Sequence, residues 1–178
     1  GLRHEVEYNL ELAGLIGAST NDKNLSLTIN NDIINNLLKE CGIREADILL
    51  ALHPWTSDPI KEWPADNFKE LTERLLKERN IKVVIIGGKD ESVKAKDFSN
   101  DISGQNLINL TGKTTLSQLG AFLKRCRLLI SADSGPVHLA SAVNTKVLVI
   151  FRNDIPGKTA RRWGPWGKGH IVIEKNNI

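Results

Sequence analysis

The hydrophobic pattern of the chain alternates between two periods from residue 47 onward. Short apolar runs end in polar loops, and they comprise DILLAL (47–52), KVVIIGG (82–88), LINLTG (107–112), RLLISA (127–132) and KVLVIF (146–151). Runs of this length are typical of strands that are buried on both faces of a parallel sheet. We therefore predict a strand at each of these five positions.

The stretches between these runs have apolar residues at helical spacing. Pro64 suits a helix start, where its missing N–H costs nothing, and Phe68, Leu71 and Leu75 then share one face. Further helices are predicted over ESVKAKDF (91–98), over TLSQLGAFLKRC (115–126) and after Ser134. Strands that alternate with helices indicate βαβ units, hence a Rossmann-like α/β fold, a parallel sheet with helices on both faces.

The first 45 residues are less regular. HEVEYNLELAGLIG (4–17) predicts an amphipathic helix closed by glycine, LSLTI (25–29) an additional strand, and residues 32–40 a helix. We predict one α/β domain, with residues 1–45 as its lead-in and residues 46–178 as its core. Because the chain opens on glycine and contains no methionine, we expect it to be a fragment.

Composition narrows the class of protein. The 178 residues suit one well-buried domain, and 40% hydrophobic with 25% charged residues argues against disorder. The net charge of +3 favours anionic ligands slightly but falls short of a nucleic-acid-binding surface. Cys41 and Cys126 lack metal-ligand spacing, so we expect reduced thiols. No apolar run is long enough to span a bilayer, and we expect no signal peptide before the domain.

Three polar loops follow the carboxyl ends of predicted strands. They are HPWTSDPIKEW (53–63), GGKDE (87–91) and SADSGPVH (131–138). In an open parallel sheet, ligands bind outside the carboxyl ends of the strands. Each loop alone is a weak indication, but their shared location predicts one ligand site.

The third loop joins a strand to a helix whose first residue is predicted at Pro136. The helix N-terminus then lies at Ser134–Gly135, where N–H groups and the helix dipole favour a phosphate. Gly135 leaves room for a close approach, and Asp133 suits sugar hydroxyls better than phosphate. The alternative, an ordinary turn capped by Asp or Ser, stays open.

The other two loops add polar side chains. Thr56 and Ser57 offer hydroxyls, and Lys61 could neutralise a diphosphate, although a single lysine is more often solvated at the surface. Asp90 or Glu91 could hold a pair of ribose hydroxyls or could cap a helix.

Several familiar motifs are missing from the sequence. It has no GxGxxG after a strand, no GxxxxGKS/T, no HExxH and no paired CxxC. The four histidines show no metal-ligand spacing: His4, His53, His138 and His170. The segment ARRWGPWGKGH (160–170) is basic and aromatic like nucleic-acid surfaces, but its glycines and proline favour a folded loop packed on the domain. We predict no metal and no cofactor.

In their order, these loops resemble the carboxyl-terminal half of glycosyltransferase family 9, the ADP-heptose:lipopolysaccharide heptosyltransferases. The resemblance rests on HPWTSDPIKEWPADNFKEL (53–71), VVIIGGKDE (83–91) and, most specifically, DSGPVHLASAV (133–143) followed by KVLVIF. HEVEYNLELAGLIG also resembles the segment that links the two halves. The family implies a GT-B transferase with two domains, of which this chain is the C-terminal, nucleotide-sugar-binding domain. It also implies metal-independent transfer of heptose with inversion at the anomeric carbon.

The resemblance implies roles for residues around the diphosphate. Lys61, with Thr56 and Ser57, would hold it and stabilise it as the leaving group. Ser134–Gly135 would complete the site through backbone N–H groups. A helix N-terminus and one lysine can stabilise the developing negative charge without a metal.

The resemblance assigns further residues to the other parts of the donor. Asp133 would face the sugar, and His138 would support the phosphate end. Asp90 or Glu91 matches the acid that binds ribose, and Thr114 would line the adenine pocket.

The partners implied are ADP-heptose or a related nucleotide sugar as substrate and a lipopolysaccharide core acceptor. The acceptor would bind through an amino-terminal domain, which also supplies the general-base aspartate and which we expect this chain to lack. We expect a cytoplasmic location, with peripheral attachment to the cytoplasmic face of the inner membrane left open, and no nucleic-acid partner. The family usually follows its last strand with Phe-Gly-Pro-Thr; here RNDIPGK (152–158) follows Phe151, which leaves the local loop shape and the sugar preference open.

Three alternatives stay open from the sequence. A non-catalytic nucleotide-binding domain would have the same loops. A nucleotide-sugar epimerase or hydrolase could share the two-domain plan, but it needs more acid/base residues than this chain shows. A basic RNA- or lipid-surface module would use Arg161, Arg162 and Lys168, with a steep salt dependence of binding.

Overall fold

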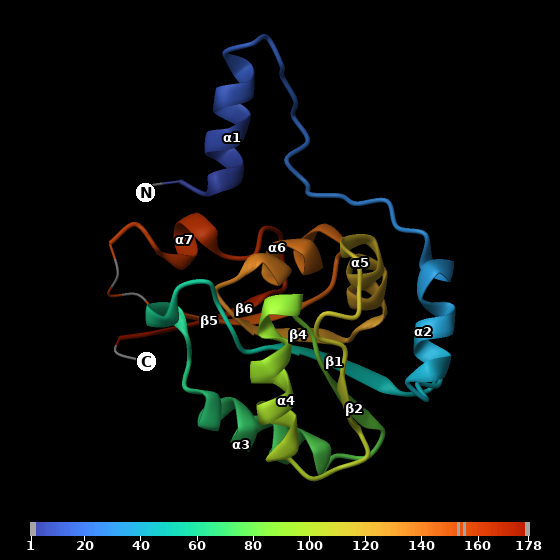
Figure 1. Cartoon of the computed structure of the whole chain (residues 1–178). Helices are drawn as coiled ribbons and strands as arrows, with labels where there is room; N and C mark the ends of the chain where they lie inside the picture. Colours follow the sequence, from blue (N-terminus) through green and yellow to red (C-terminus); the bar gives the residue numbers. More distant parts are fainter. Residues whose placement is uncertain (1–2, 153, 155, 177–178) are drawn as a thin grey trace.

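The computed structural model describes residues 3–152, 154 and 156–176. Residues 1, 2, 177 and 178 of the predicted domain and positions 153 and 155 of RNDIPGK lie outside the described residues. Within the described part, six strands form one parallel sheet in the order β3-β2-β1-β4-β5-β6 (Figure 1). The strands are β1 (Ile48–His53), β2 (Ile81–Ile85), β3 (Leu107–Asn109), β4 (Leu128–Ala132), β5 (Val147–Arg152) and β6 (Ile171–Lys175).

Helices cover both faces of the sheet, which confirms the predicted fold class. On one face lie α3 (Ala65–Leu76) and α4 (Ser92–Asn100), and on the other α5 (Leu116–Arg125) and α6 (Gly135–Ala142) (Figure 1). The remaining helical segments are α1 (Glu5–Gly14), α2 (Asn35–Glu40) and α7 (Ala160–Trp163), with 3-10 turns at η1 (Asn31–Ile34), η2 (Pro59–Lys61) and η3 (Lys89–Glu91). None of the helices in the described residues is long and apolar enough to cross a membrane.

Each face of the sheet has its own apolar core, because successive side chains of a strand point to opposite faces. On β2, Val84 packs in the cluster below α5 and α6, whereas Val83 and Ile85 pack with Phe68 of α3 and Phe98 of α4. All five side chains are buried. The central strands therefore form a well-packed base for the loops at their carboxyl ends.

The segment Leu25–Ile29 is not a strand, contrary to the prediction. Its apolar residues pack on helices and not on a sheet edge: the Leu27 N–H donates to the Ala142 carbonyl, and Ile29 lies against Gly120 of α5. One backbone hydrogen bond to the end of a helix cannot form a ladder. An alternating apolar pattern can thus arise from a chain that crosses two helices.

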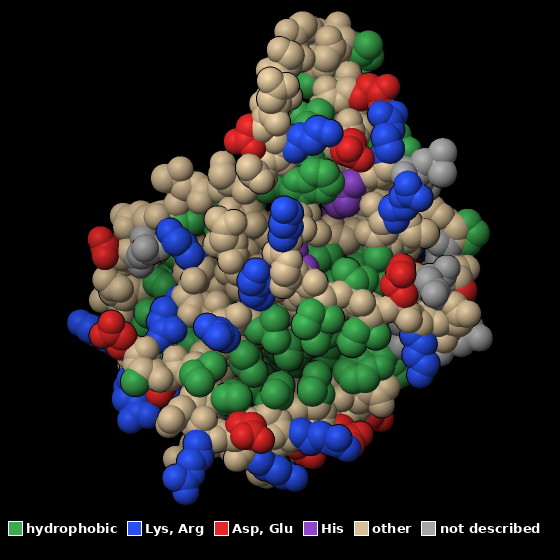
Figure 2. All heavy atoms as spheres, turned by 180° about the vertical axis from the view of Figure 1, so that it is seen from behind, with side chains coloured by type: hydrophobic (Ala, Val, Ile, Leu, Met, Phe, Trp, Pro, Cys, Tyr) green, Lys and Arg blue, Asp and Glu red, His purple; other side chains and the backbone are tan. Residues whose placement is uncertain are grey.

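Strand β6 extends the sheet beyond the five predicted strands. It pairs with β5 over five positions, and its residues are exposed on both faces. Ile171 and Ile173 pair with Leu148 and Ile150 of β5, so they continue the α3 and α4 face of the sheet. Figure 2 shows a broad apolar surface on the back of the molecule, where the edge formed by β6 lies.

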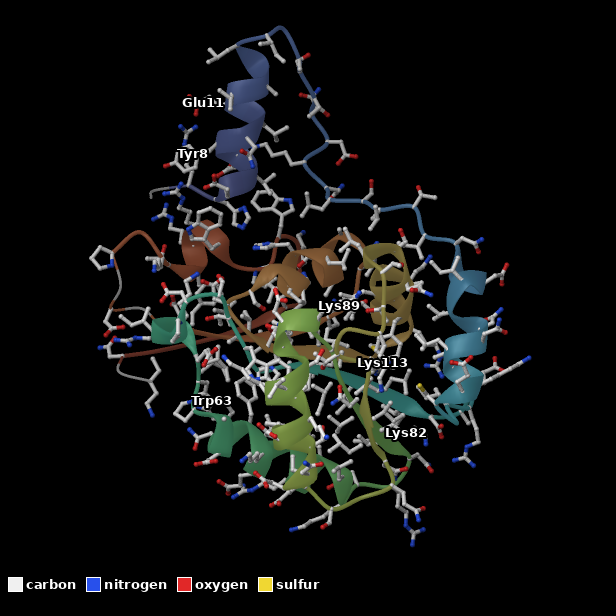
Figure 3. The ribbon with its side chains drawn as sticks, in the orientation of Figure 1. Tyr8, Glu11, Trp63, Lys82, Lys89 and Lys113 are labelled. Atoms are coloured by element: carbon white, nitrogen blue, oxygen red, sulfur yellow. The ribbon has the colours of Figure 1, made fainter. Side chains whose placement is uncertain are left out.

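The segment ARRWGPWGKGH packs on the chain as a folded element, as predicted. Arg162 of α7 donates to Glu5 of α1 at 2.8 Å and lies over the ring of Tyr8. The His4 ring packs against Trp166 at a tilt of 45°, with ring centroids 4.6 Å apart. These contacts hold the base of α1, whose free end projects away from the sheet (Figures 1 and 3).

Candidate functional site

A cavity of about 380 Å³ opens at the carboxyl ends of β1, β2 and β4. Its volume falls in the range of small-molecule sites, roughly 300–1,000 Å³. The lining residues are His53, Thr56, Ser57, Gly87, Gly88, Glu91, Thr114, Thr115, Leu116, Leu119, Ser134, Gly135 and Pro136. The three predicted loops therefore meet around one space, and a fourth loop, which follows β3, completes it.

The structure brings six of the ten predicted site residues to this cavity. They are Thr56, Ser57, Glu91, Thr114, Ser134 and Gly135. The other four are not among its lining residues: Lys61, Asp90, Asp133 and His138. Two of these four contact each other: Lys61 of the first loop pairs with Asp133 of the third loop.

The first loop is held in shape by its own side chains. The Thr56 hydroxyl donates to the Asp58 carbonyl at 2.5 Å and accepts from the Asp58 N–H at 3.1 Å, which makes a tight turn. The Asp58 carboxylate pairs with Lys158 and accepts from the Ile60 N–H. Ser57 is exposed, and its hydroxyl makes no hydrogen bond within the described part of the chain. Ser57 is thus the more available of the two hydroxyls.

Lys61 and Asp133 form an ion pair that joins the first loop to the third. The Lys61 Nζ lies 2.7 Å from the Asp133 Oδ2, and the Asp133 side chain is only 9% exposed. An ammonium group has three N–H donors, so this contact leaves two for another acceptor. The pair can therefore keep its bond and still offer positive charge to an anionic ligand.

Helix α6 begins at the cavity wall without a side-chain cap. Ser134 is its N-cap residue, Gly135 its first residue and Pro136 its second, close to the prediction. The Ser134 side chain makes no capping bond, because its hydroxyl contacts His53, Ser131 and the carbonyl of Ala132. The positive end of the helix dipole is therefore directed toward the cavity.

Of the two acids in the second loop, Glu91 lines the cavity and Asp90 does not. Glu91 Oε2 accepts from the Gly88 N–H at 2.7 Å and lies 3.3 Å from His53 Nε2. Burial raises the pKa of Glu91, but the hydrogen bonds and charges around it, led by His53, outweigh burial and lower it. Glu91 is thus a carboxylate at neutral pH. Asp90 is exposed to solvent.

Sequence reasoning did not predict the remaining lining residues, of which Leu116, Leu119 and His53 matter most for the shape and polarity of the cavity. Leu116 and Leu119 of α5 form an apolar wall beside Thr114. His53, at the end of β1, is 4% exposed and hydrogen-bonds to both Ser134 and Glu91. A histidine that ends a buried apolar run was a signal for this position, since a buried ring nitrogen needs a partner.

His138 lies one turn into α6 and is half-buried. Burial lowers its pKa, Asp133 opposes that effect, and His4 and Lys61 add to it. The ring therefore stays neutral at physiological pH. The charges of both Asp133 and Lys61 thus act on this ring.

A second cavity, of about 640 Å³, lies at the opposite end of the sheet, next to α2 and α5. It contains none of the three loops, so its larger volume does not make it the better candidate. Over residues 3–152, 154 and 156–176, the structure shows no group of three or more His, Cys, Asp or Glu side chains that could hold a metal ion.

The model of glycosyltransferase family 9 (heptosyltransferase) matches residues 3–177. The chain belongs to this family. Among curated relatives, lipopolysaccharide heptosyltransferase 3 of Escherichia coli (strain K12) is 26% identical over 178 residues, which is 98% of this chain and 50% of that protein. Lipooligosaccharide heptosyltransferase 2 of Haemophilus ducreyi is 33% identical over 89 residues, 48% of this chain and 25% of that protein. This family 9 chain thus spans half the length of the first relative, and its match to the second covers a quarter of that protein.

Solved structures show the same fold. The family 9 glycosyl transferase from Veillonella parvula DSM 2008 superposes with a TM-score of 0.85 at 24% identity, over 98% of this chain and 50% of that chain. The E. coli heptosyltransferase WaaC, solved with ADP, gives a TM-score of 0.68 at 22% identity, over 98% and 51%.

Proposed function

We propose that this chain is the donor-binding half of a heptosyltransferase that moves heptose from ADP-heptose to a lipopolysaccharide inner-core acceptor. Residues 46–178 would bind the donor, and residues 1–45 would connect them to an acceptor domain. The observation that carries the proposal is the cavity in which the N-terminus of α6 meets Glu91 and the apolar wall of α5. Family membership favours transfer over epimerisation, hydrolysis or a purely regulatory site.

The cavity offers a different surface for each part of ADP. Leu116 and Leu119, beside Thr114, suit the apolar faces of adenine. The Glu91 carboxylate suits the ribose hydroxyl pair, since a carboxylate accepts two hydrogen bonds from neighbouring hydroxyls. The N-terminus of α6, at Gly135, suits the diphosphate.

The same groups can assist departure of ADP from the sugar. As the bond from the anomeric carbon to the diphosphate breaks, negative charge accumulates on the leaving phosphate. The N–H groups of α6 and the Lys61 ammonium would stabilise that charge without a metal. Asp133, fixed by Lys61, would accept hydrogen bonds from the sugar, and His138 would support the phosphate end from behind. Attack by the acceptor from the opposite side inverts the anomeric carbon, and its proton would pass to an aspartate of the acceptor domain.

Calorimetric titration with ADP, UDP and ADP-heptose tests this proposal. We expect ADP and ADP-heptose to bind, with UDP weaker because a pyrimidine covers less of the Leu116 and Leu119 wall. Absence of binding by all three at millimolar concentration, in a folded chain, would contradict the donor site. Equal binding of ADP and UDP would contradict the assignment of the base.

We also propose that the enzyme works in the cytoplasm, at the inner face of the membrane where its acceptor is anchored. The proposal follows from the acceptor class and predicts that cell fractionation recovers the protein in the cytosol or loosely on the membrane. Recovery in the periplasm would contradict it.

A further inference from the structure

His53 is a buried titratable residue to which the mechanism above gives no role. It is the last residue of β1, its side chain is 5% exposed, and its ring stands edge-on to Trp55 with centroids 6.0 Å apart. A ring in this position has two nitrogen atoms that need partners inside the protein. Both partners belong to the walls of the donor cavity.

The two ring nitrogens of His53 contact two different loops. Nδ1 lies 2.9 Å from the Ser134 Oγ, in the third loop, and Nε2 lies 3.3 Å from the Glu91 Oε2, in the second loop. His53 itself belongs to the first loop. One side chain that lines the cavity therefore connects all three loops.

The chemistry of the partners determines where the protons are. A carboxylate only accepts, so Nε2 must carry the hydrogen that faces Glu91. In the neutral ring, Nδ1 then accepts from the Ser134 hydroxyl. The Ser134 hydroxyl has one proton, for which His53 Nδ1 at 2.9 Å and the Ala132 carbonyl at 3.2 Å compete, and the shorter contact favours His53.

The Glu91 carboxylate is engaged on one oxygen only. Oε2 accepts from both the Gly88 N–H and His53, whereas no residue in the described part of the chain hydrogen-bonds to Oε1. Two donors on one oxygen fix the rotation of the carboxylate about its final bond. The second oxygen then has a defined direction at the edge of the cavity, where Glu91 is a lining residue.

We propose that His53 is a positioning residue for the ribose: its Nε2–H holds Oε2 of Glu91, so that Oε1 is presented to the hydroxyl pair of the bound nucleoside diphosphate. The inference rests on the proposed function, because it assumes that a nucleoside diphosphate occupies the cavity. It adds that the preference for a ribose with both hydroxyls depends on His53, which acts through Glu91.

The test compares the affinity of ADP with that of 2′,3′-dideoxy-ADP, in the wild-type chain and in two variants. In His53→Asn, the amide occupies the region of Nδ1, so the contact to Ser134 is kept and the contact to Glu91 is lost. In His53→Gln, the longer amide reaches the region of Nε2, so the contact to Glu91 is kept. The two variants are matched in polarity, and each breaks one of the two contacts.

We expect the wild-type chain to bind ADP at least about tenfold more tightly than the dideoxy analogue, as a hydrogen bond to a charged group allows. His53→Asn should lose most of that ratio, and His53→Gln should keep it. Glu91→Gln should lower the ratio in the wild-type chain and leave it unchanged in His53→Asn. This non-additivity would show that the two residues act through one interaction.

Other outcomes distinguish a failure of the His53 inference from a failure of the proposed function. An unchanged ratio of ADP to dideoxy-ADP affinity in His53→Asn, or an equal loss of this ratio in His53→Asn and His53→Gln, would overturn the role of His53. Neither result would contradict the proposed function. A wild-type chain that binds ADP and its dideoxy analogue equally would overturn the ribose role of Glu91 and this inference with it. Nitrogen NMR of the wild-type histidines tests the geometry even where a variant does not fold: a neutral His53 that is protonated on Nδ1 would also overturn the inference.

Discussion

At the scale of single residues, the Lys61–Asp133 pair decides how charge is distributed at the proposed diphosphate site. Both groups are largely withdrawn from solvent, so each depends on the other. Removal of one partner leaves a buried charge without compensation and can lower stability as well as binding. Substitutions here therefore need a control that also breaks an ion pair of lysine.

Lys61→Met should lower the affinity for ADP by about tenfold or more, because a charge-assisted contact to phosphate is lost. Lys69→Met is the matched control, since Lys69 on α3 pairs with Asp101 at 2.6 Å and is as exposed as Lys61, 27% against 22%. The measurement is calorimetric titration of both variants at equal folded fraction. Equal losses in the two variants would argue against a role of Lys61 in binding.

His138→Gln should reduce the loss of stability that acid causes. Because the pKa of His138 is lowered in the folded chain, the unfolded chain binds the proton more readily, and folding is disfavoured as pH falls below about 6.5. A neutral amide at this position removes that contribution. Denaturant unfolding at pH 7.5 and pH 5.5 measures the difference.

The contribution of His138 must be separated from that of His170, whose pKa burial also lowers. Only the change between the wild-type chain and His138→Gln isolates His138, because His170 contributes to both. If the two chains lose the same free energy of unfolding between the two pH values, His138 does not titrate differently in the folded state.

At the scale of elements, the start of α6 allows binding to be separated from stability. A Cβ at Gly135 meets no atom within 4 Å, and a helical residue other than glycine lowers the entropy of the unfolded chain. Gly135→Ala should therefore keep or slightly raise the unfolding midpoint. It should also weaken the binding of ADP, because the methyl group occupies the place where the phosphate approaches the N–H groups.

Thermal unfolding and ADP titration of Gly135→Ala give the two readouts. Unchanged affinity with unchanged stability would show that α6 begins at the cavity without contacting the ligand. An ordinary strand-to-helix turn that binds no ligand predicts this result.

The loop after β2 makes a contrasting prediction for two adjacent glycines. A Cβ at Gly87 would lie 2.4 Å from Glu91 Oε2 and 3.1 Å from a methyl group of Thr111, whereas one at Gly88 would lie 3.9 Å from the nearest atom. Gly87→Ala should displace the Glu91 carboxylate and cost about 1–3 kcal/mol of unfolding free energy. Gly88→Ala should be close to neutral. Equal stability of the two variants would mean that Glu91 moves aside freely.

The elements themselves were largely predictable from the sequence. The five apolar runs became β1 to β5, because a buried parallel strand excludes polar side chains from both faces. The prediction failed at Leu25–Ile29, where helices and not a sheet bury the apolar positions. It omitted β6, whose exposed edge position leaves little constraint on its composition.

At the scale of the whole molecule, β6 leaves part of one sheet face uncovered. Ile171 is 54% and Ile173 45% exposed, and both continue the buried rows through Leu148 and Ile150. We expect this surface, visible in Figure 2, to bind a hydrophobic dye in the folded chain. Ile173→Lys should lower the dye fluorescence at equal folded fraction.

Val172→Lys is the control for that measurement. Val172 is 41% exposed and neighbours Ile173 on the same edge strand, but it pairs with Val149 and therefore points to the opposite face. It should lower the fluorescence less than Ile173→Lys. An equal decrease would mean that the dye binds the strand edge and not the sheet face.

The candidate site shows the boundary between what each level of structure determined. By itself, the sequence determined the parallel sheet, the three loops and the start of α6, because the spacing of apolar residues and the conformations of Gly and Pro act over a few neighbouring positions. It left Asp90 and Glu91 equivalent.

Only the tertiary structure distinguished these two acids, since it placed His53 of β1 next to Glu91, 38 positions later, and left Asp90 exposed. It also joined Lys61 to Asp133 and brought the wall of α5 to the cavity. The order of strands in a sheet decides which loops become neighbours, and that order follows from packing of the complete chain. Local sequence patterns therefore did not predict the contacts between loops.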